Sequence, residues 1–289
     1  MIKLYKLNDI TVTIPTLNEE KNIEECIISV KKAGIKKILI IDGCSNDDTL
    51  KIIKKHKVKL LSLKKKRGLA YQRMIGVKHT KTKFIALIDA DMRPKKNCFK
   101  FMLKDLVTSR YVGVEAIIKS FTKKLNYFDK SYQEIMEVNI NKKGPRRMIG
   151  TPTLWYTKIL KQNNFDPFFS GPSDDTDVCY KIFKKGHYFG GSTGICYHVH
   201  RSNLNQYFKK YLWYGKGDAL FIIKHPERTF SILKHQLFNY PIKFSYLAIK
   251  KFRILPIPFM IVSGLLRFFG MIIELVKRIF QFKANIYNT

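Results

Sequence analysis

The 289-residue sequence has few cysteines, few acidic residues and no motif for binding nucleic acid. Its five cysteines form no Cys-x-x-Cys pair, which argues against a cysteine zinc site or a disulfide framework and fits reduced thiols in the cytosol. Zinc-finger spacing, an RNP-type signature and a Gly-x-Gly-x-x-Gly loop are all absent. The first residues also lack the continuous apolar run of a signal peptide, so we expect a cytoplasmic protein.

Positive charge dominates the composition. Lys and Arg number 54 against 22 Asp and Glu, which gives a formal net charge of +32. Such an excess favours anionic partners, namely phosphates, lipid headgroups or nucleic acid, although a lysine-rich proteome would also contribute to it. With 45% apolar residues, a chain of this length can form one large domain with an appendage, or two modest domains.

Strand and helix patterns alternate four times in the first part of the chain. The expected strands cover residues 10–15, 38–41, 58–63 and 84–88, and the expected helices begin near Asn18, Asp48 and Leu69. Asn18 is expected to cap the first helix, and Gly34 to end it. This alternation predicts an α/β fold with a mostly parallel sheet and helices on both faces, which places Pro15, Asp42 and Asp89 at the same edge.

Asp89 and Asp91 follow a buried strand and stand one residue apart. In an open α/β sheet the carboxyl ends of the strands form the ligand crevice, so acids there can hold a divalent metal against a substrate's phosphates. The simpler alternative is an Asp-rich turn that ends the strand.

Acids also stand at three other expected element ends, namely Glu19 with Glu20, Asp42, and Asp174 with Asp175 and Asp177. Group transfer from a nucleotide diphosphate requires a pocket for the base, a cation beside the leaving diphosphate and often a carboxylate that takes a proton from the attacking hydroxyl. These acids can fill those three roles.

Four segments, in this order and spacing, resemble the family 2 glycosyltransferases of GT-A fold. They are residues 13–20 (TIPTLNEE), 41–49 (IDGCSNDDT), 89–91 (DAD) and 173–177 (SDDTD). The likeness covers about residues 8–200 and implies a Rossmann-like GT-A domain over residues 1–205. It also implies an inverting transfer of one sugar from a nucleotide-diphosphate sugar.

The resemblance assigns roles to particular residues. The nucleotide-sugar pocket would include Pro15, Asn18, Glu19, Asp42, Arg73, Asp89 and Asp174, and Asp91 and Asp89 would bind Mn²⁺ or Mg²⁺. Asp175 would be the general base, while Asp174 could simply complement a helix dipole. Arg73 either reaches a phosphate or is a solvated helix cation. His198 and the lower-ranked His200 are candidates for a further metal ligand, with a structural histidine as the alternative.

The sequence departs from the family pattern at several positions. Asp42-Gly43-Cys44-Ser45 stands where many relatives have Asp-Asp-Gly-Ser, so the base preference stays open, with uridine as the default. Met74 stands where Asn is frequent. Trp213 is not part of the Gln-x-x-Arg-Trp signature of processive synthases, which favours transfer of a single sugar.

Two basic segments lie outside these motifs. The helix breakers and cations in residues 141–152 predict a mobile lid. We expect its cations, Lys142, Lys143, Arg146 and Arg147, to lie near an acceptor phosphate. Residues 206–289 form a basic, aromatic-rich helical segment. Its stretch 254–276 is long enough to cross a membrane but is interrupted by Arg267, Glu274 and two prolines. We therefore expect helices that lie on an anionic membrane surface, with a helical cap on the catalytic domain as the alternative.

The leading hypothesis is a metal-dependent enzyme, peripheral or monotopic on the inner face of the membrane, that transfers a sugar to a glycan or lipid-linked acceptor. A polyprenyl- or dolichyl-phosphate sugar synthase of the same fold is the nearest alternative. A nucleic-acid-binding protein and a catalytically inactive membrane adaptor are alternatives from other classes, and no motif supports the first of them.

Overall fold

The computed structural model describes residues 5–121, 125–137, 143–199 and 203–287, with side chains as far as residue 281. It divides into two compact units. The first contains residues 1–123, 140–170 and 174–200, and the second contains residues 124–139, 171–173 and 201–289. The second unit thus gathers two earlier segments besides the C-terminal part, and the expected functional division at residue 205 stays a prediction.

The first unit contains a mixed sheet of nine strands within the described residues. Its parallel part has the order β3-β2-β1-β4, formed by β1 (Ile10–Thr16), β2 (Lys37–Asp42), β3 (Lys59–Ser62) and β4 (Phe84–Leu87). The connecting helices are α1 (Ile23–Lys32), α2 (Thr49–Lys54) and α3 (Leu69–His79). The predicted alternation of strands and helices is therefore confirmed.

The carboxyl ends of β1, β2 and β4 meet at one edge. Thr16 pairs with Asp42, and the Ile88 N–H donates to the Thr13 carbonyl. The common edge expected from the sequence is thus present. One local expectation is wrong: Asn22, not Asn18, precedes α1, because Asn18 adopts a left-handed conformation with φ 56° in the loop before it. Gly34, with φ +89°, follows the end of α1 as expected.

Beyond β4 the sheet changes direction. β8 (Thr153–Tyr156) pairs antiparallel with β4, and β6 (Gly113–Ser120), β9 (Phe189–His198) and β5 (Met92–Pro94) follow in that order. β7 (Gly144–Arg146) pairs antiparallel with β9. Part of the expected mobile lid is therefore a strand, and Lys142 lies outside the described residues.

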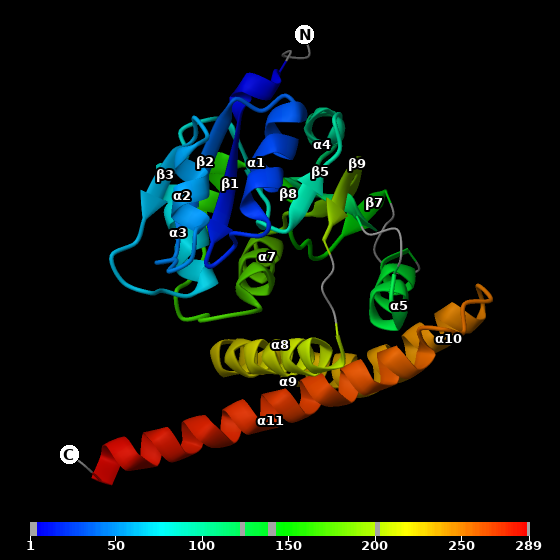
Figure 1. Cartoon of the computed structure of the whole chain (residues 1–289). Helices are drawn as coiled ribbons and strands as arrows, with labels where there is room; N and C mark the ends of the chain where they lie inside the picture. Colours follow the sequence, from blue (N-terminus) through cyan, green and yellow to red (C-terminus); the bar gives the residue numbers. More distant parts are fainter. Residues whose placement is uncertain (1–4, 122–124, 138–142, 200–202, 288–289) are drawn as a thin grey trace. The chain divides into compact units, whose positions relative to one another are not determined.

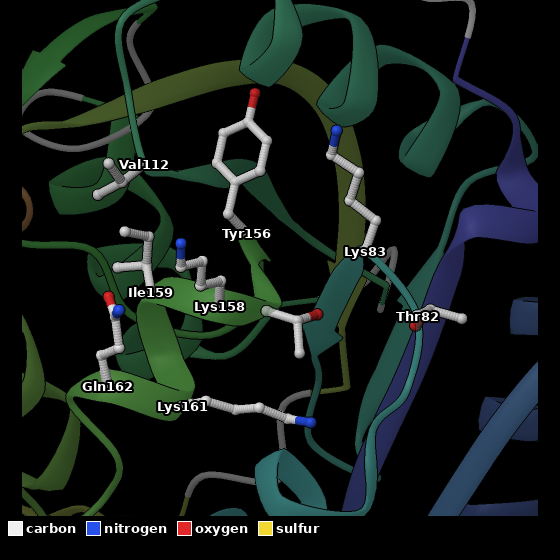
Figure 2. A pocket seen from close by; sticks show the side chains of 9 residues that line it. Thr82, Lys83, Val112, Tyr156, Lys158, Ile159, Lys161 and Gln162 are labelled. Atoms are coloured by element: carbon white, nitrogen blue, oxygen red, sulfur yellow. The ribbon is translucent and has the colours of Figure 1, made fainter.

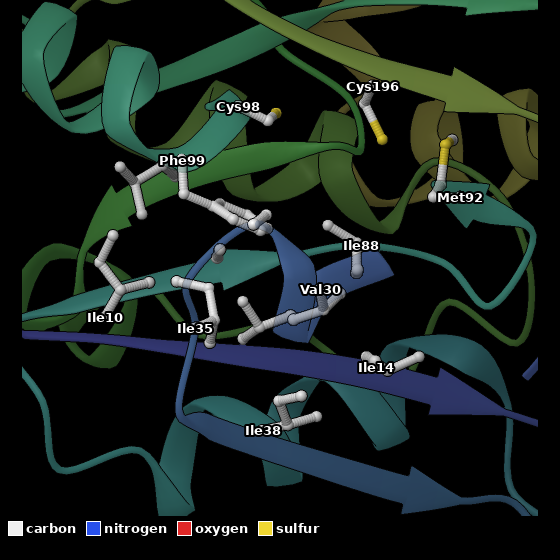
Figure 3. Packing of buried hydrophobic residues seen from close by; sticks show 14 of the residues in the cluster. Ile10, Ile14, Val30, Ile35, Ile38, Ile88, Met92, Cys98, Phe99 and Cys196 are labelled. Atoms are coloured by element: carbon white, nitrogen blue, oxygen red, sulfur yellow. The ribbon is translucent and has the colours of Figure 1, made fainter. Parts of the chain in front are cut away.

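Helices cover both faces of the sheet (Figure 1). On one face, Ile10, Ile14 and Ile88 pack with α1, α2 and α4 (Cys98–Val107), as Figure 3 shows for part of this cluster. On the other face, Ile85 and Leu87 pack with α3, α6 (Thr157–Gln162) and α7 (Asp174–Lys184). Strand side chains alternate between the faces, so β4 contributes to both cores.

The second unit is helical. It comprises α5 (Tyr127–Ile135), α8 (Leu204–Lys224), η3 (Pro226–Arg228), α9 (Thr229–Lys234), the π-helical η4 (His235–Lys243), α10 (Phe244–Ile249) and α11 (Ile257–Tyr287). α8 and α11 approach closely at Gly215 and Gly270, where an added Cβ would lie 2.1 Å and 2.3 Å from a backbone carbonyl oxygen of the other helix. Between these helices, Arg267 Nη2 lies 2.7 Å from Asp218 Oδ1. The Asp218 carboxylate thus compensates the charge of the largely buried Arg267 guanidinium.

Candidate active site

Two motif segments form one wall at the carboxyl edge of the sheet. The Asn18 N–H donates to Ser45 Oγ (2.9 Å), and Asn18 Oδ1 accepts from the Asn46 N–H (3.0 Å). The Glu19 N–H donates to Thr49 Oγ1 (2.8 Å). These bonds join the loop after β1 to the loop after β2, so two segments that lie far apart in the sequence form one hydrogen-bonded surface.

Asp42 shapes the loop after β2. Its carboxylate is fully buried, with Oδ2 accepting from the N–H groups of Cys44 (3.0 Å) and Ser45 (3.1 Å) and Oδ1 accepting from Ser45 Oγ (2.6 Å). Local hydrogen bonds of this kind are typical of Asp in turns. The contact between Asp42 and a nucleotide base therefore stays a prediction, as does that of Pro15, which lies in β1 opposite Ile41.

Packing explains the glycine in the Asp-Gly-Cys-Ser sequence. A Cβ added at Gly43 would lie 2.5 Å from Nε2 of Gln72, a buried side chain on α3. A larger residue would have to displace that amide, since real Cβ contacts are not this short. Gln72 thus fills the space that a side chain at position 43 would need.

Arg73 joins two of the predicted site carboxylates. Its guanidinium is 5% exposed, and Nη1 donates to both oxygens of Asp174 (2.9 and 3.0 Å) while Nη2 donates to Asp89 Oδ1 (3.0 Å). Burial raises the pKa of Asp174 to about 6, and Arg73 opposes this rise, so the carboxylate is still ionised at neutral pH. The solvated alternative for Arg73 is wrong, because its charge is buried between two acids.

The Asp89 and Asp91 side chains contact different partners. Asp89 Oδ2 accepts from Thr151 Oγ1 (2.6 Å), so both of its oxygens are engaged by protein groups. Asp91 Oδ2 lies 3.1 Å from Nε2 of His198, with side-chain exposures of 34% and 15%. Within the described residues, no three Asp, Glu, His or Cys side chains gather as a metal site. The three proposed ligands therefore do not form one group here, although Asp91 and His198 meet; His200 lies outside the described residues.

Asp175 lies in the first turn of α7 and is half-buried. Its Oδ1 accepts from the Thr176 N–H (2.7 Å), and its Oδ2 lies 3.3 Å from the position that a Cβ on Gly150 would occupy. Asp174, its neighbour, is held by Arg73. Of the two adjacent acids, only Asp175 is thus outside the Arg73 ion pair.

Sequence reasoning missed Glu115 in β6. This buried carboxylate accepts from the Gly150 N–H (3.0 Å) and pairs with Arg146. Burial raises the pKa of Glu115 to about 7, and Arg146 opposes the rise. A single acid with apolar neighbours on both sides, Val114 and Ala116, was the only available signal.

The three cations of the expected lid that lie within the described residues have partners of their own. Arg146 pairs with Glu115, Lys143 Nζ lies 3.5 Å from Asp105 Oδ1, and Arg147 lies over the ring of Phe183 at 5.8 Å. The proposed contact between these cations and an acceptor phosphate stays a prediction.

A depression of about 610 Å³ lies at the amino end of β4, opposite the end that carries Asp89. Figure 2 shows its lining, which includes Lys83, Tyr156 and Ile159. Its walls contribute none of the predicted catalytic or metal-binding side chains.

Comparison with known proteins decides the class. The family model described as "Glycosyl transferase family 2" matches residues 11–167. The chain belongs to this family. It is therefore a glycosyltransferase of a type that acts on nucleotide sugars, and the predicted family, α/β GT-A fold and enzyme class are confirmed.

Two curated relatives of this chain differ in sequence identity and in the share of each chain that the match covers. A Methanococcus voltae protein, named dolichyl N-acetyl-alpha-D-glucosaminyl phosphate 3-beta-D-2,3-diacetamido-2,3-dideoxy-beta-D-glucuronosyltransferase, is 25% identical over 97% of this chain and 91% of the relative. The poly(ribitol-phosphate) beta-N-acetylglucosaminyltransferase TarS of Staphylococcus aureus is 31% identical over 31% of this chain and 17% of the relative.

Solved structures support the fold. TarS residues 1–349 align with a TM-score of 0.55 at 16% identity, covering 93% of this chain and 91% of TarS 1–349. Glucosyl-3-phosphoglycerate synthase from Mycobacterium tuberculosis, solved with Mn²⁺, UDP and glucosyl-3-phosphoglycerate, aligns with a TM-score of 0.56 at 15% identity, covering 74% of this chain and 78% of that one.

Proposed function

We propose that this glycosyltransferase moves a single sugar from a UDP-sugar to a lipid-linked acceptor, with inversion and with a divalent cation, at the inner face of a membrane. The observation that carries this proposal is the gathering of acids at the carboxyl edge of the sheet. There Asp89 and Asp174 are fixed by one buried arginine, while Asp91 and Asp175 stay outside that ion pair.

Asp91 and His198 are the residues that would hold Mn²⁺ or Mg²⁺. They lie 3.1 Å apart and are partly exposed, and the carboxylate of Asp91 is the kind of ligand that both cations prefer, with the His198 imidazole as the second group. Mg²⁺ in particular is usually held by one or two carboxylates together with substrate phosphates, so the small number of protein groups fits a cation shared with the donor diphosphate. When bound, the cation would neutralise charge on the leaving diphosphate.

Asp175 is the proposed general base. Asp174 is occupied by Arg73, which leaves Asp175 as the acid able to accept a proton from the acceptor hydroxyl. The acceptor oxygen would form a bond to the anomeric carbon as the bond from that carbon to the diphosphate oxygen breaks. One in-line displacement of this kind inverts the configuration.

The second unit supports a location on the membrane surface. Within the described residues, one helix segment, Ile257–Gln281, is long and apolar enough to cross a membrane, with a mean hydropathy of 2.0. One face of α11 packs on α8, where Arg267 pairs with Asp218. Its other face exposes an apolar stripe, formed by Ile261, Val262, Leu265, Phe269, Ile272, Ile273 and Val276.

This two-sided pattern favours a helix that lies in the headgroup region over one that spans the bilayer. A span would bring the charged pair and the lysines of α8 toward the hydrocarbon core. A helix in the plane of the interface would bury only the apolar stripe, while the unit's many cations meet anionic headgroups. The name of the M. voltae relative describes a dolichyl-linked sugar phosphate as its acceptor, which supports a lipid-linked acceptor here.

A donor and acceptor screen tests the proposal. The purified chain is incubated with Mn²⁺ and a panel of UDP- and GDP-sugars, with either a polyprenyl-phosphate-linked sugar or polyprenyl phosphate alone. We expect chelator-sensitive release of UDP and a product one sugar larger on the lipid-linked sugar. A product formed on polyprenyl phosphate alone would identify the synthase alternative. Absence of transfer and hydrolysis with every donor would contradict the proposal.

A further inference from the structure

We propose that Glu115 is a positioning residue that holds segment 146–151 against Asp89 and Asp175. The inference deepens the proposed function, because it concerns the same site. Glu115 is not one of the residues that the family resemblance points to.

The carboxylate of Glu115 fastens this segment at two points. Oε1 accepts from the Gly150 N–H at 3.0 Å, and Oε2 pairs with Nη1 of Arg146, at the end of β7. Each oxygen therefore has a different partner. A single side chain in β6 thus contacts both ends of residues 146–150.

The same segment contacts two acids of the site through consecutive residues. A Cβ on Gly150 would lie 3.3 Å from Asp175 Oδ2 and 3.7 Å from Glu115 Oε1, so both carboxylates lie beside Gly150. Thr151 Oγ1 donates to Asp89 Oδ2 at 2.6 Å. A shift of residues 150 and 151 would therefore change the surroundings of the proposed base and of a donor-site acid together.

The sheet is irregular next to Glu115. The pairing of β6 with β9 shifts register between Glu115 and Ile117. Bulges of this kind redirect side chains and occur often beside active sites. A buried acid is costly without partners, and both oxygens of Glu115 find theirs in residues 146–150.

The test compares Glu115→Ala and Glu115→Gln with a matched control, Asp105→Asn. Asp105 is also a largely buried acid that accepts from a backbone N–H (Thr193, 2.7 Å), but its partners are Ser192, Thr193 and Lys143 (3.5 Å), none of which lies in residues 146–151. In Glu115→Ala we expect kcat to fall about 10- to 100-fold, the scale of a displaced catalytic group, with the donor KM within about threefold of wild type. The kcat of Glu115→Gln should fall less than that of Glu115→Ala, because the glutamine amide oxygen can still accept from the Gly150 N–H.

A second measurement does not require activity. Hydrogen exchange of the Gly150 amide should become faster in Glu115→Ala than in wild type, and should be unchanged in Asp105→Asn, because only the first variant removes the acceptor. Unchanged exchange at Gly150 would overturn the inference. A kcat of Glu115→Ala equal to that of Asp105→Asn would also overturn it. The same holds if Glu115→Ala loses kcat, donor affinity and melting temperature in parallel. An inactive wild type would instead contradict the proposed function, while the exchange result would still decide on Glu115.

Discussion

Replacing Arg73 tests the central ion-pair network most directly. Arg73→Met keeps much of the apolar volume but removes the cation between Asp174 and Asp89, of which Asp174 is 1% exposed. Removal of one partner from a buried ion pair costs about 3–5 kcal/mol, because the remaining charge lacks compensation. For a domain of this size that corresponds to a decrease in melting temperature of roughly 6–20 °C.

The destabilisation caused by Arg73→Met should increase with pH. The pKa of Asp174 is raised to about 6 from the model-compound value 3.8, so the native state binds the proton more tightly than the unfolded state does. Stability from this group is therefore present at low pH and is lost as pH rises through 6. Without Arg73 the native pKa of Asp174 should rise further, so the variant should be more destabilised at pH 7.5 than at pH 5.

The assay is thermal or urea unfolding of wild type, Arg73→Met and the control Arg67→Met across this pH range. Arg67 precedes the same helix but is exposed, with its guanidinium over the Tyr71 ring at 5.4 Å. We expect the control to change stability by less than about 0.5 kcal/mol. Equal melting temperatures for the two variants, or a loss in Arg73→Met that is the same at both pH values, would refute the reasoning.

Three further predictions concern the proposed chemistry and the membrane surface. Asp91→Ala should abolish the Mn²⁺-dependent part of UDP binding in calorimetry, because Asp91 is the proposed carboxylate ligand. Asp175→Asn should keep donor affinity but lower turnover by about 10²-fold or more, the scale of lost general-base catalysis. Phe269→Ser with Ile273→Ser should reduce sedimentation with anionic liposomes, because both side chains lie on the exposed stripe of α11.

Controls make these outcomes decisive. Phe101→Ser removes a comparably exposed aromatic ring from α4 in the first unit and should leave liposome binding unchanged. If the two α11 substitutions sediment like this control, the stripe is not the membrane-binding surface. Metal-dependent UDP binding that survives in Asp91→Ala would contradict the ligand assignment, and normal turnover of Asp175→Asn would remove that residue from the mechanism.

Local patterns in the sequence predicted much of the first unit. The helix expected to begin near Leu69 is α3, and the strands that lead to Asp42 and Asp89 end at a common edge. Such features depend on periodicity and turn chemistry within a few residues, which the sequence displays directly. The expected cap at Asn18 was wrong because that residue bonds to a distant loop instead of to its own helix.

The sequence by itself determined the family, the order of strands and helices in the parallel half of the sheet, and which acids stand at the strand ends. Only the tertiary structure decided what those acids contact. Arg73 meets Asp174, 101 residues away, and Glu115 meets Gly150, 35 residues away. Contacts across such separations depend on how the whole sheet pairs and buries charge, and no pattern within a short window of sequence encodes them.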